Sequence, residues 1–275
     1  MRFLLVVTLA LLPLRAALAQ FDHAHAAWNA LLAKHVVVID GGKASQVRYA
    51  SFAQDRAALK SYLDGLSRVA PAEFAGWTKA QQMAFLINAY NAFTVEKVLT
   101  RYPDLKSIRD FGRVIGNPFK DRFFVLLGTE ASLDRVEHEL LRAKGVYDEP
   151  RVHFAVNCAS IGCPMLREEA YVADRLDAQL ESQTLRFLSD RTRNRYDAAK
   201  NVLEVSKIFD WFKEDWQSGY RGIGQDAPPI GSREQFFAKY ADALAATPEG
   251  RQAVRSQKVP LAFLDYDWTL NDVRR

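Results

Sequence analysis

Residues 151–164 read RVHFAVNCASIGCP, and the rest of the chain is organised around this stretch. Its first half alternates apolar and polar residues, which predicts a strand with one polar face. Its second half places Cys158, Ser160 and Cys163 close together and ends on Pro164, so both cysteines of the protein lie in one bend. No other segment gathers so many reactive side chains. We therefore expect the functional site here.

The start of the chain resembles a targeting segment. Residues 1–19 are predicted to be a signal peptide. Arg2 supplies the positively charged n-region, residues 3–14 form the apolar h-region, and Ala17–Ala19 form an A-x-A cleavage site. The apolar run is shorter than the roughly 20 residues that a membrane-spanning helix needs. We expect a periplasmic or secreted protein without a stable membrane anchor after signal cleavage.

Composition and charge narrow the classes of partner. The 275 residues are 49% apolar, 25% charged and 12% aromatic, which favours a packed globular protein over a disordered one. Loss of Arg2 and Arg15 with the leader lowers the formal net charge from +4 to +2. This weak positive charge, without a basic run interleaved with aromatic residues, predicts no nucleic-acid partner. The expected partner is an unidentified small molecule or peptide, and the sequence predicts no cofactor.

The predicted fold class is α+β. We expect a single helix-rich domain over residues 24–271, packed on a small sheet of about four or five short strands. Capping-box spacing predicts helix starts at Ser51 and Thr78. Ser232 is predicted to cap a further helix, and Thr247 and Pro248 to start a short one. Residues 219–231 form the one loop long enough to act as a lid. The other predicted elements are helices at 24–34, 133–144, 166–188 and 207–216, strands at 35–39 and 122–127, and a hairpin at 194–206.

Two amides interrupt the apolar helix that begins at Thr78. Asn88 and Asn91 are three residues apart, so they lie on one side of this helix. Burying each amide costs about 1–3 kcal/mol unless it is hydrogen-bonded. They either hold a loop in place or line a functional site.

Glu137 is the most anomalous acid in the sequence. It falls in the middle of the apolar face of the predicted helix 133–144, and His138 lies at the border of that face. A carboxylate directed at the core must be paired, hydrogen-bonded or protonated. We expect this helix to meet the bend at 157–164 in a common polar pocket.

Several blocks follow one another along the chain: LINAYNAFTVEKVL (86–99), YPDLKSIRD (102–110), SLDRVEHELLR (132–142), RVHFAVNCASIGCP (151–164), SKIFDWF (206–212) and YDWTLN (266–271). Together they resemble the family called domain of unknown function 547, over roughly residues 80–271. The resemblance implies a single domain but no reaction. It also implies that the signature motifs include Asn88, Asn91, Glu137, His138, Asn157, Cys158, Ser160 and Pro164.

The bend allows several chemistries. A disulfide between Cys158 and Cys163 suits an exported protein, since a turn of this length brings Cα atoms within the allowed distance of about 4.4–6.8 Å. Alternatively, Cys158 is a nucleophile, with His138 as its base and Glu137 as the group that orients the base. A zinc site of Cys158, Cys163, His138 and His153 has looser spacing than usual, so no metal is expected. Ser160 matches only half of a nucleophile elbow.

Two functions follow from these alternatives. The preferred hypothesis is a binding or scaffold protein with a polar pocket around the disulfide-stapled bend, and its binding residues are Asn88, Asn91, His153, Asn157 and Ser160. The other hypothesis is a thiol-dependent hydrolase or transferase that uses Cys158, His138 and Glu137. The sequence leaves open whether the protein is an enzyme.

Overall fold

The structure, a computed structural model, describes residues 20–112, 116–217, 222–223 and 229–273. The predicted signal peptide and much of the predicted lid at 219–231 lie outside these residues. The central element is helix α5 (Lys79–Leu99). Thr78 accepts a hydrogen bond from the Gln81 backbone and the Gln81 side chain accepts one from the Thr78 backbone, so the predicted capping box is confirmed. Every residue from 82 to 99 is buried.

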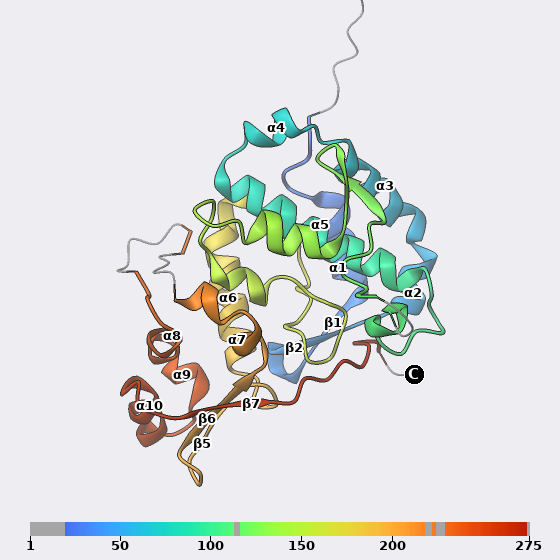
Figure 1. The fold of residues 1–275 in the computed structure, drawn as a ribbon. Helices are drawn as coiled ribbons and strands as arrows, with labels where there is room; N and C mark the ends of the chain where they lie inside the picture. The colour runs from blue at the N-terminus through green and yellow to red at the C-terminus, as the bar shows by residue number, and fades with distance from the viewer. Residues whose placement is uncertain (1–19, 113–115, 218–221, 224–228, 274–275) are drawn as a thin grey trace, which may run out of the picture.

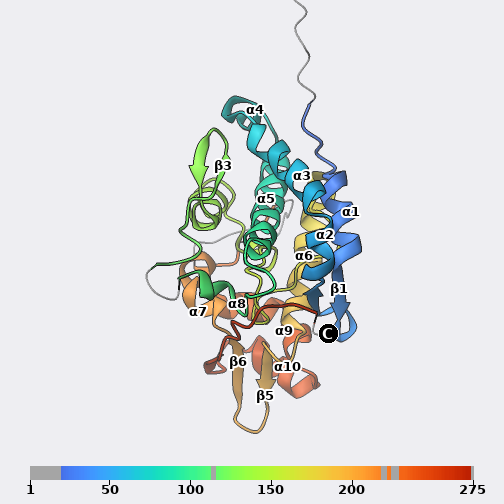
Figure 2. The ribbon, with the colours of Figure 1, turned by 90° about the vertical axis from the view of Figure 1, so that its right-hand side faces the viewer.

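The N-terminal helices enclose α5 in the larger of two apolar clusters. Figure 2 shows α5 between these helices on one side and β3 (Phe124–Leu126) on the other. α3 (Arg56–Arg68) packs directly against both α1 (Ala26–His35) and α5. The surrounding helices are α1 (Ala26–His35), α2 (Tyr49–Gln54), α3 (Arg56–Arg68), α4 (Pro71–Ala75) and α6 (Leu176–Leu188).

A second apolar cluster lies beside a three-stranded sheet in the lower part of Figure 1. In this sheet β6 (Val202–Ser206) pairs antiparallel with β5 (Arg195–Asp197) and parallel with β7 (Leu261–Leu264). The second apolar cluster contains the fully buried side chains of Phe209, Trp216 and Phe236. The helices of this part are α7 (Ile208–Trp211), α8 (Arg233–Lys239), α9 (Ala241–Leu244) and α10 (Pro248–Arg255).

The α+β prediction is confirmed, but the described strands form three small sheets and not one. β1 (Val36–Ile39) pairs with β2 (Ala44–Val47), and β3 pairs with β4 (Thr129–Ala131). Both pairs are short antiparallel hairpins that pack at the edges of the helical core. Short irregular helices complete the fold: η1 (Asp40–Gly42), η2 (Ile108–Gly112), the π-helix η3 (Arg135–Leu141), η4 (Pro150–Phe154), η5 (Ala173–Arg175) and η6 (Lys213–Trp216).

The predicted strand at the start of the central stretch is wrong. Residues 150–154 form the 3-10 helix η4, in which Pro150 occupies the first turn and the Glu149 side chain caps the Arg151 backbone. Val152 packs in the first apolar cluster and Phe154 in the second. Because η4 is buried on all sides, the alternation in its sequence carries no information about a single wet face.

Two predicted helix starts are also wrong. Ser51 lies inside α2, which begins at Tyr49 without a side-chain cap. The helix predicted over 166–188 begins only at Leu176, because Ala170 and Val172 are held in irregular backbone by hydrogen bonds with Gln179. By contrast, the predicted cap at Ser232 is confirmed, since its hydroxyl accepts a hydrogen bond from the Gln235 backbone.

The C-terminal segment joins the two halves of the molecule. After β7 it runs back towards β1 and β2 (Figure 1), where Asp272 bridges Val47. On the way Leu270 bridges Ser160, and the Asn271 backbone donates a hydrogen bond to the Ala159 carbonyl. The bend at 157–164 is therefore held by the end of the chain. Within the described residues, no helix is both long and apolar enough to cross a membrane.

Candidate functional site

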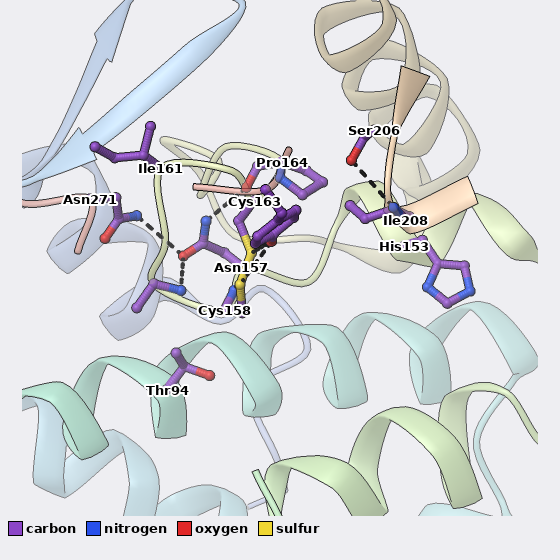
Figure 3. Close-up of a disulfide and its surroundings, with 12 residues drawn as sticks. Thr94, His153, Asn157, Cys158, Ile161, Cys163, Pro164, Ser206, Ile208 and Asn271 are labelled. Carbon is purple, nitrogen blue, oxygen red and sulfur yellow. Dashed lines mark hydrogen bonds between the residues drawn. A yellow bond between two sulfur atoms is a disulfide. The ribbon is translucent and has the colours of Figure 1, made fainter. Parts of the chain in front are cut away.

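A disulfide closes the bend at 157–164. Cys158 and Cys163 are bonded, with Cα atoms 6.1 Å apart, so the predicted pairing is confirmed. Inside the bend, the Asn157 amide donates to the Pro164 carbonyl at 2.7 Å and accepts from the Ala159 backbone at 2.9 Å. Asn271 donates to the same Asn157 oxygen (Figure 3). The amide thus organises the loop that carries the disulfide.

Asn88 and Asn91 hold backbone segments against α5. Asn88 donates to the Tyr171 carbonyl at 2.7 Å and accepts from its backbone N–H at 3.0 Å. Asn91 donates to the Ala155 carbonyl and accepts from the Asn157 N–H at 2.8 Å. Both amides are buried, and each donates one hydrogen bond to the backbone and accepts one from it. This is the loop-holding role that the sequence suggested as one alternative.

A pocket of about 160 Å³ opens beside the disulfide. Its wall is formed by the π-helix η3, the helix η4, the bend, the end of α7 and the aromatic residues that follow β7. Both Glu137 and the two cysteines line it, so the 133–144 segment and the bend do share one hollow. The full lining is Tyr90, Asn117, Phe119, Asp134, Glu137, His138, His153, Val156, Cys158, Cys163, Pro164, Ile208, Trp211, Phe212, Tyr266 and Trp268.

Glu137 is the acid at the inner wall. Its side chain is 13% exposed, and this burial raises the pKa of its carboxyl to about 7. The positive charge of Arg142 and the hydrogen bond from the Tyr90 hydroxyl lower the pKa of Glu137, whereas the negative charges of Asp134 and Asp215 raise it further. Near neutral pH the carboxyl therefore exchanges a proton readily.

His153 connects Glu137 to a second acid. Its Nε2 lies 2.8 Å from Oδ2 of Asp215, and its Nδ1 lies 3.8 Å from Oε1 of Glu137. Burial lowers the pKa of His153, with Asp215 acting against this effect. A neutral ring that donates Nε2–H to the Asp215 carboxylate leaves the Nδ1 lone pair facing Glu137. At 3.8 Å the Glu137 oxygen lies beyond hydrogen-bond distance of this nitrogen, so the two groups are neighbours in the pocket wall without a direct hydrogen bond.

Arg142 fixes Asp215 in place. Its guanidinium donates to both carboxylate oxygens, at 2.6 and 3.0 Å. Burial alone would raise the pKa of Asp215, but hydrogen bonds from His153 and Arg142 hold it well below its usual value. Asp215 therefore remains an anion that orients His153, and its sequence position, in an aromatic helix far from the bend, gave no local signal of this role.

His138 occupies a more exposed position. Its side chain is 38% exposed, and it lines the pocket at 3.7 Å from Asp134 while its Nδ1 contacts the Arg142 guanidinium. Burial, followed by the Arg142 charge, lowers the pKa of His138. The sequence favoured His138 as the base next to Glu137, but in the structure the ring that faces Glu137 is His153.

Aromatic rings form the outer wall. Tyr266 contacts Trp268 and Trp211 with tilted rings, at centroid distances of 4.6 and 4.9 Å. The Tyr266 hydroxyl lies 3.2 Å from Sγ of Cys158 and 3.1 Å from Sγ of Cys163, so the disulfide forms the floor beneath this ring. None of these rings was predicted as a site residue, although Trp211, Tyr266 and Trp268 all lie in blocks that carried the family resemblance.

The predicted site residues thus separate into two groups. Glu137, His138, His153, Cys158 and Cys163 line the pocket. The others are buried behind it: Asn88, Asn91 and Asn157 bind backbone groups, and Ser160 bridges the C-terminal segment, with no hydrogen bond from its hydroxyl to a described residue. In the part of the chain that the structure describes, no three His, Cys, Asp or Glu side chains are arranged to hold a metal ion.

The disulfide leads to a direct test. Replacing both cysteines by serine should lower the free energy of unfolding by about 2 kcal/mol, because the unfolded chain regains the freedom of a short closed loop. Denaturant unfolding of this variant and of the oxidised and reduced wild type measures the effect. Thiol titration of the unreduced protein should find no free thiol, and two reactive thiols would contradict the pairing.

One protein family matches the chain. The model of the family described as "Protein of unknown function, DUF547" matches residues 74–188 and confirms the resemblance over that range. The matched range contains Glu137, His153 and both cysteines, whereas Asp215, Tyr266 and Trp268 lie beyond it. No curated protein and no solved structure matches the chain.

Proposed function

We propose that the protein is exported and binds a small, partly apolar ligand in the pocket next to the disulfide. The observation that carries this proposal is the composition of the pocket wall. Six aromatic rings line the pocket together with the polar side chains of Glu137 and His153. Small-molecule sites commonly combine apolar walls with a few placed polar groups in this way.

The size of the pocket limits the ligand. An engineered apolar cavity of about 150 Å³ in another protein accepts benzene. A pocket of about 160 Å³ would therefore accept a group of comparable size. A larger ligand would have to leave its remainder outside, towards the groove that shares Asn117, Phe119, Trp211 and Trp268 with the pocket.

Two features support export. Residues 1–19 have the sequence features of a signal peptide, and the disulfide is of a kind that persists in oxidising compartments such as the bacterial periplasm. The thiol-dependent hydrolase or transferase does not fit this structure, because it needs a free Cys158 thiol and that sulfur is bonded to Cys163.

Binding of benzyl alcohol tests the pocket. We expect saturable binding with a dissociation constant on the order of 1 mM, which suits so small a ligand. Val156→Phe fills the pocket from its wall and should weaken binding at least about tenfold by the loss of apolar contact. Ligand-observed NMR titration measures both constants.

Matched controls separate filling from misfolding. Val125→Phe makes the same replacement at a 44% exposed strand position and should leave binding unchanged. Trp211→Ala removes part of the wall from a ring that is already 46% exposed, so the protein should fold while binding weakens. Equal affinity in wild type, Val156→Phe and Trp211→Ala would contradict a ligand site here.

A further inference from the structure

We propose that the ligand of this pocket carries an ammonium group, held between the Glu137 carboxylate and the rings of Trp211 and Tyr266. This inference rests on the proposed binding function and specifies its ligand class. It follows from the charges and the ring faces around the pocket.

The charged groups that line the pocket are of one sign. Asp134 and Glu137 are its acids, and no lysine or arginine is among its lining residues in the described ranges. Burial lowers the pKa of both lining histidines, which keeps them neutral near pH 7. The Arg142 guanidinium binds Asp215 through Nε and Nη2, and its Nη1 contacts His138. An anion would find no free positive partner on these walls, whereas an ammonium ion would find carboxylates.

The aromatic wall suits a cation as well. Trp211, Tyr266 and Trp268 contact one another, with centroid distances of 4.6 to 5.8 Å. Clusters of this kind bind ammonium groups through their negative ring faces, and tryptophan does so best. Phe212 and Trp268 already hold the guanidinium groups of Arg142 and Arg109, at 4.7 and 5.1 Å from the ring centroids.

Binding of an ammonium ligand should change the protonation of Glu137, whereas binding of an uncharged apolar ligand should not. A bound ammonium ion stabilises the carboxylate, so binding below pH 7 should release the Glu137 proton to solvent. The titratable and charged groups that face this carboxyl are Tyr90 from α5, His153 from η4, Asp215 from η6, Tyr266 from the segment after β7, and Asp134 and Arg142 from its own segment. His138 lines the same pocket. Burial lowers the pKa of both histidines, and hydrogen bonds from His153 and Arg142 lower that of Asp215, so Glu137 is the group expected to titrate with ligand near neutral pH.

Three probes of matched shape test the charge: benzylamine, benzyl alcohol and benzoate, each by isothermal titration calorimetry. Benzylamine should bind at least about tenfold tighter than benzyl alcohol at pH 8. Its affinity should rise about 30-fold from pH 5.5 to 8, as the Glu137 carboxyl ionises. At pH 6, titrations in two buffers of different ionisation enthalpy should show release of about one proton per ligand.

Two glutamine variants on the same helix show whether the preference for benzylamine depends on the Glu137 carboxylate. Glu137→Gln should lose at least about tenfold in benzylamine affinity and flatten its pH dependence, while benzyl alcohol binding changes less than about twofold. Glu139→Gln is the matched control, because its side chain is 67% exposed on the same helix and does not line the pocket. It should bind all three probes as the wild type does.

The outcomes distinguish the two proposals. If benzyl alcohol binds and benzylamine binds no tighter, the ammonium inference is overturned and the binding function stands. Tighter binding of benzoate would likewise overturn it in favour of an anionic ligand. If no probe binds to correctly folded wild-type protein, the binding function fails together with the inference.

Discussion

Substitution of Arg151 by methionine is expected to lower the free energy of unfolding by about 3–5 kcal/mol. Arg151 is 1% exposed, and its guanidinium donates to both oxygens of Glu149, which is fully buried. It also binds Asp177 and Glu181 on α6. Methionine fills similar space but leaves the Glu149 carboxylate without its cation, and an uncompensated buried charge is costly. Urea unfolding measures the loss.

Two further variants test this explanation. Arg186→Met removes another bidentate arginine, but Arg186 and its partner Glu168 are 25% and 33% exposed, so the loss should be at most about 1 kcal/mol. Adding Glu149→Gln to Arg151→Met should restore at least about 1 kcal/mol, because the unpaired charge is gone. Equal losses for Arg151→Met and Arg186→Met would show that burial of the pair is not the cause.

Replacing Glu137 by glutamine should stabilise the protein at pH 8 by up to about 3 kcal/mol and change little at pH 4.5. The pKa of Glu137 in the folded protein, about 7, lies above its ordinary value of 4.5. The contribution of Glu137 to stability is therefore complete below pH 4.5, falls as the pH rises between these two values, and is lost above pH 7. Glutamine does not ionise, so the free energy of unfolding of the variant does not decrease in this way as the pH rises.

The difference in unfolding free energy between wild type and Glu137→Gln, measured every half unit from pH 4.5 to 8, isolates this group from all others. Glu139→Gln serves again as the control and should show a flat difference, since its carboxylate is largely exposed. A flat difference for Glu137→Gln would mean that its pKa is not raised. A loss of stability at pH 8 would show that the carboxylate is needed for folding.

These two expectations together bear on function. Arg151 and Glu149 compensate each other's charge, so they stabilise η4, which carries His153 into the pocket wall. Among the residues that the structure describes, no lysine or arginine is paired with Glu137 in this way, and its ionised form lowers stability at neutral pH. Groups that cost stability in a pocket are candidates for binding or catalysis, because structure alone gives no reason to retain them.

Local chemistry in the sequence determined a substantial part of the fold. The Thr78 capping box, the caps at Ser232 and Thr247 and the hairpin over 194–206 depend on neighbours a few residues apart, and the structure confirms them. The disulfide was predictable for the same reason, because Cys158 and Cys163 are close in sequence and have no other partner in the chain. Glu137 was identifiable because the apolar residues around it form one face of a predicted helix, and such a face is also a pattern of residues only three or four apart.

Only the tertiary structure decided the rest. η4 was mistaken for a strand because it lies between two apolar clusters, and burial on every side removes the periodic signal. Asp215 meets His153 from 62 residues away, and Tyr266 meets Cys158 from 108 residues away. Such contacts depend on the path of the whole chain, which no local spacing encodes. The sequence alone therefore identified the acid and the sulfurs, and folding determined which histidine faces the acid and which rings enclose the pocket.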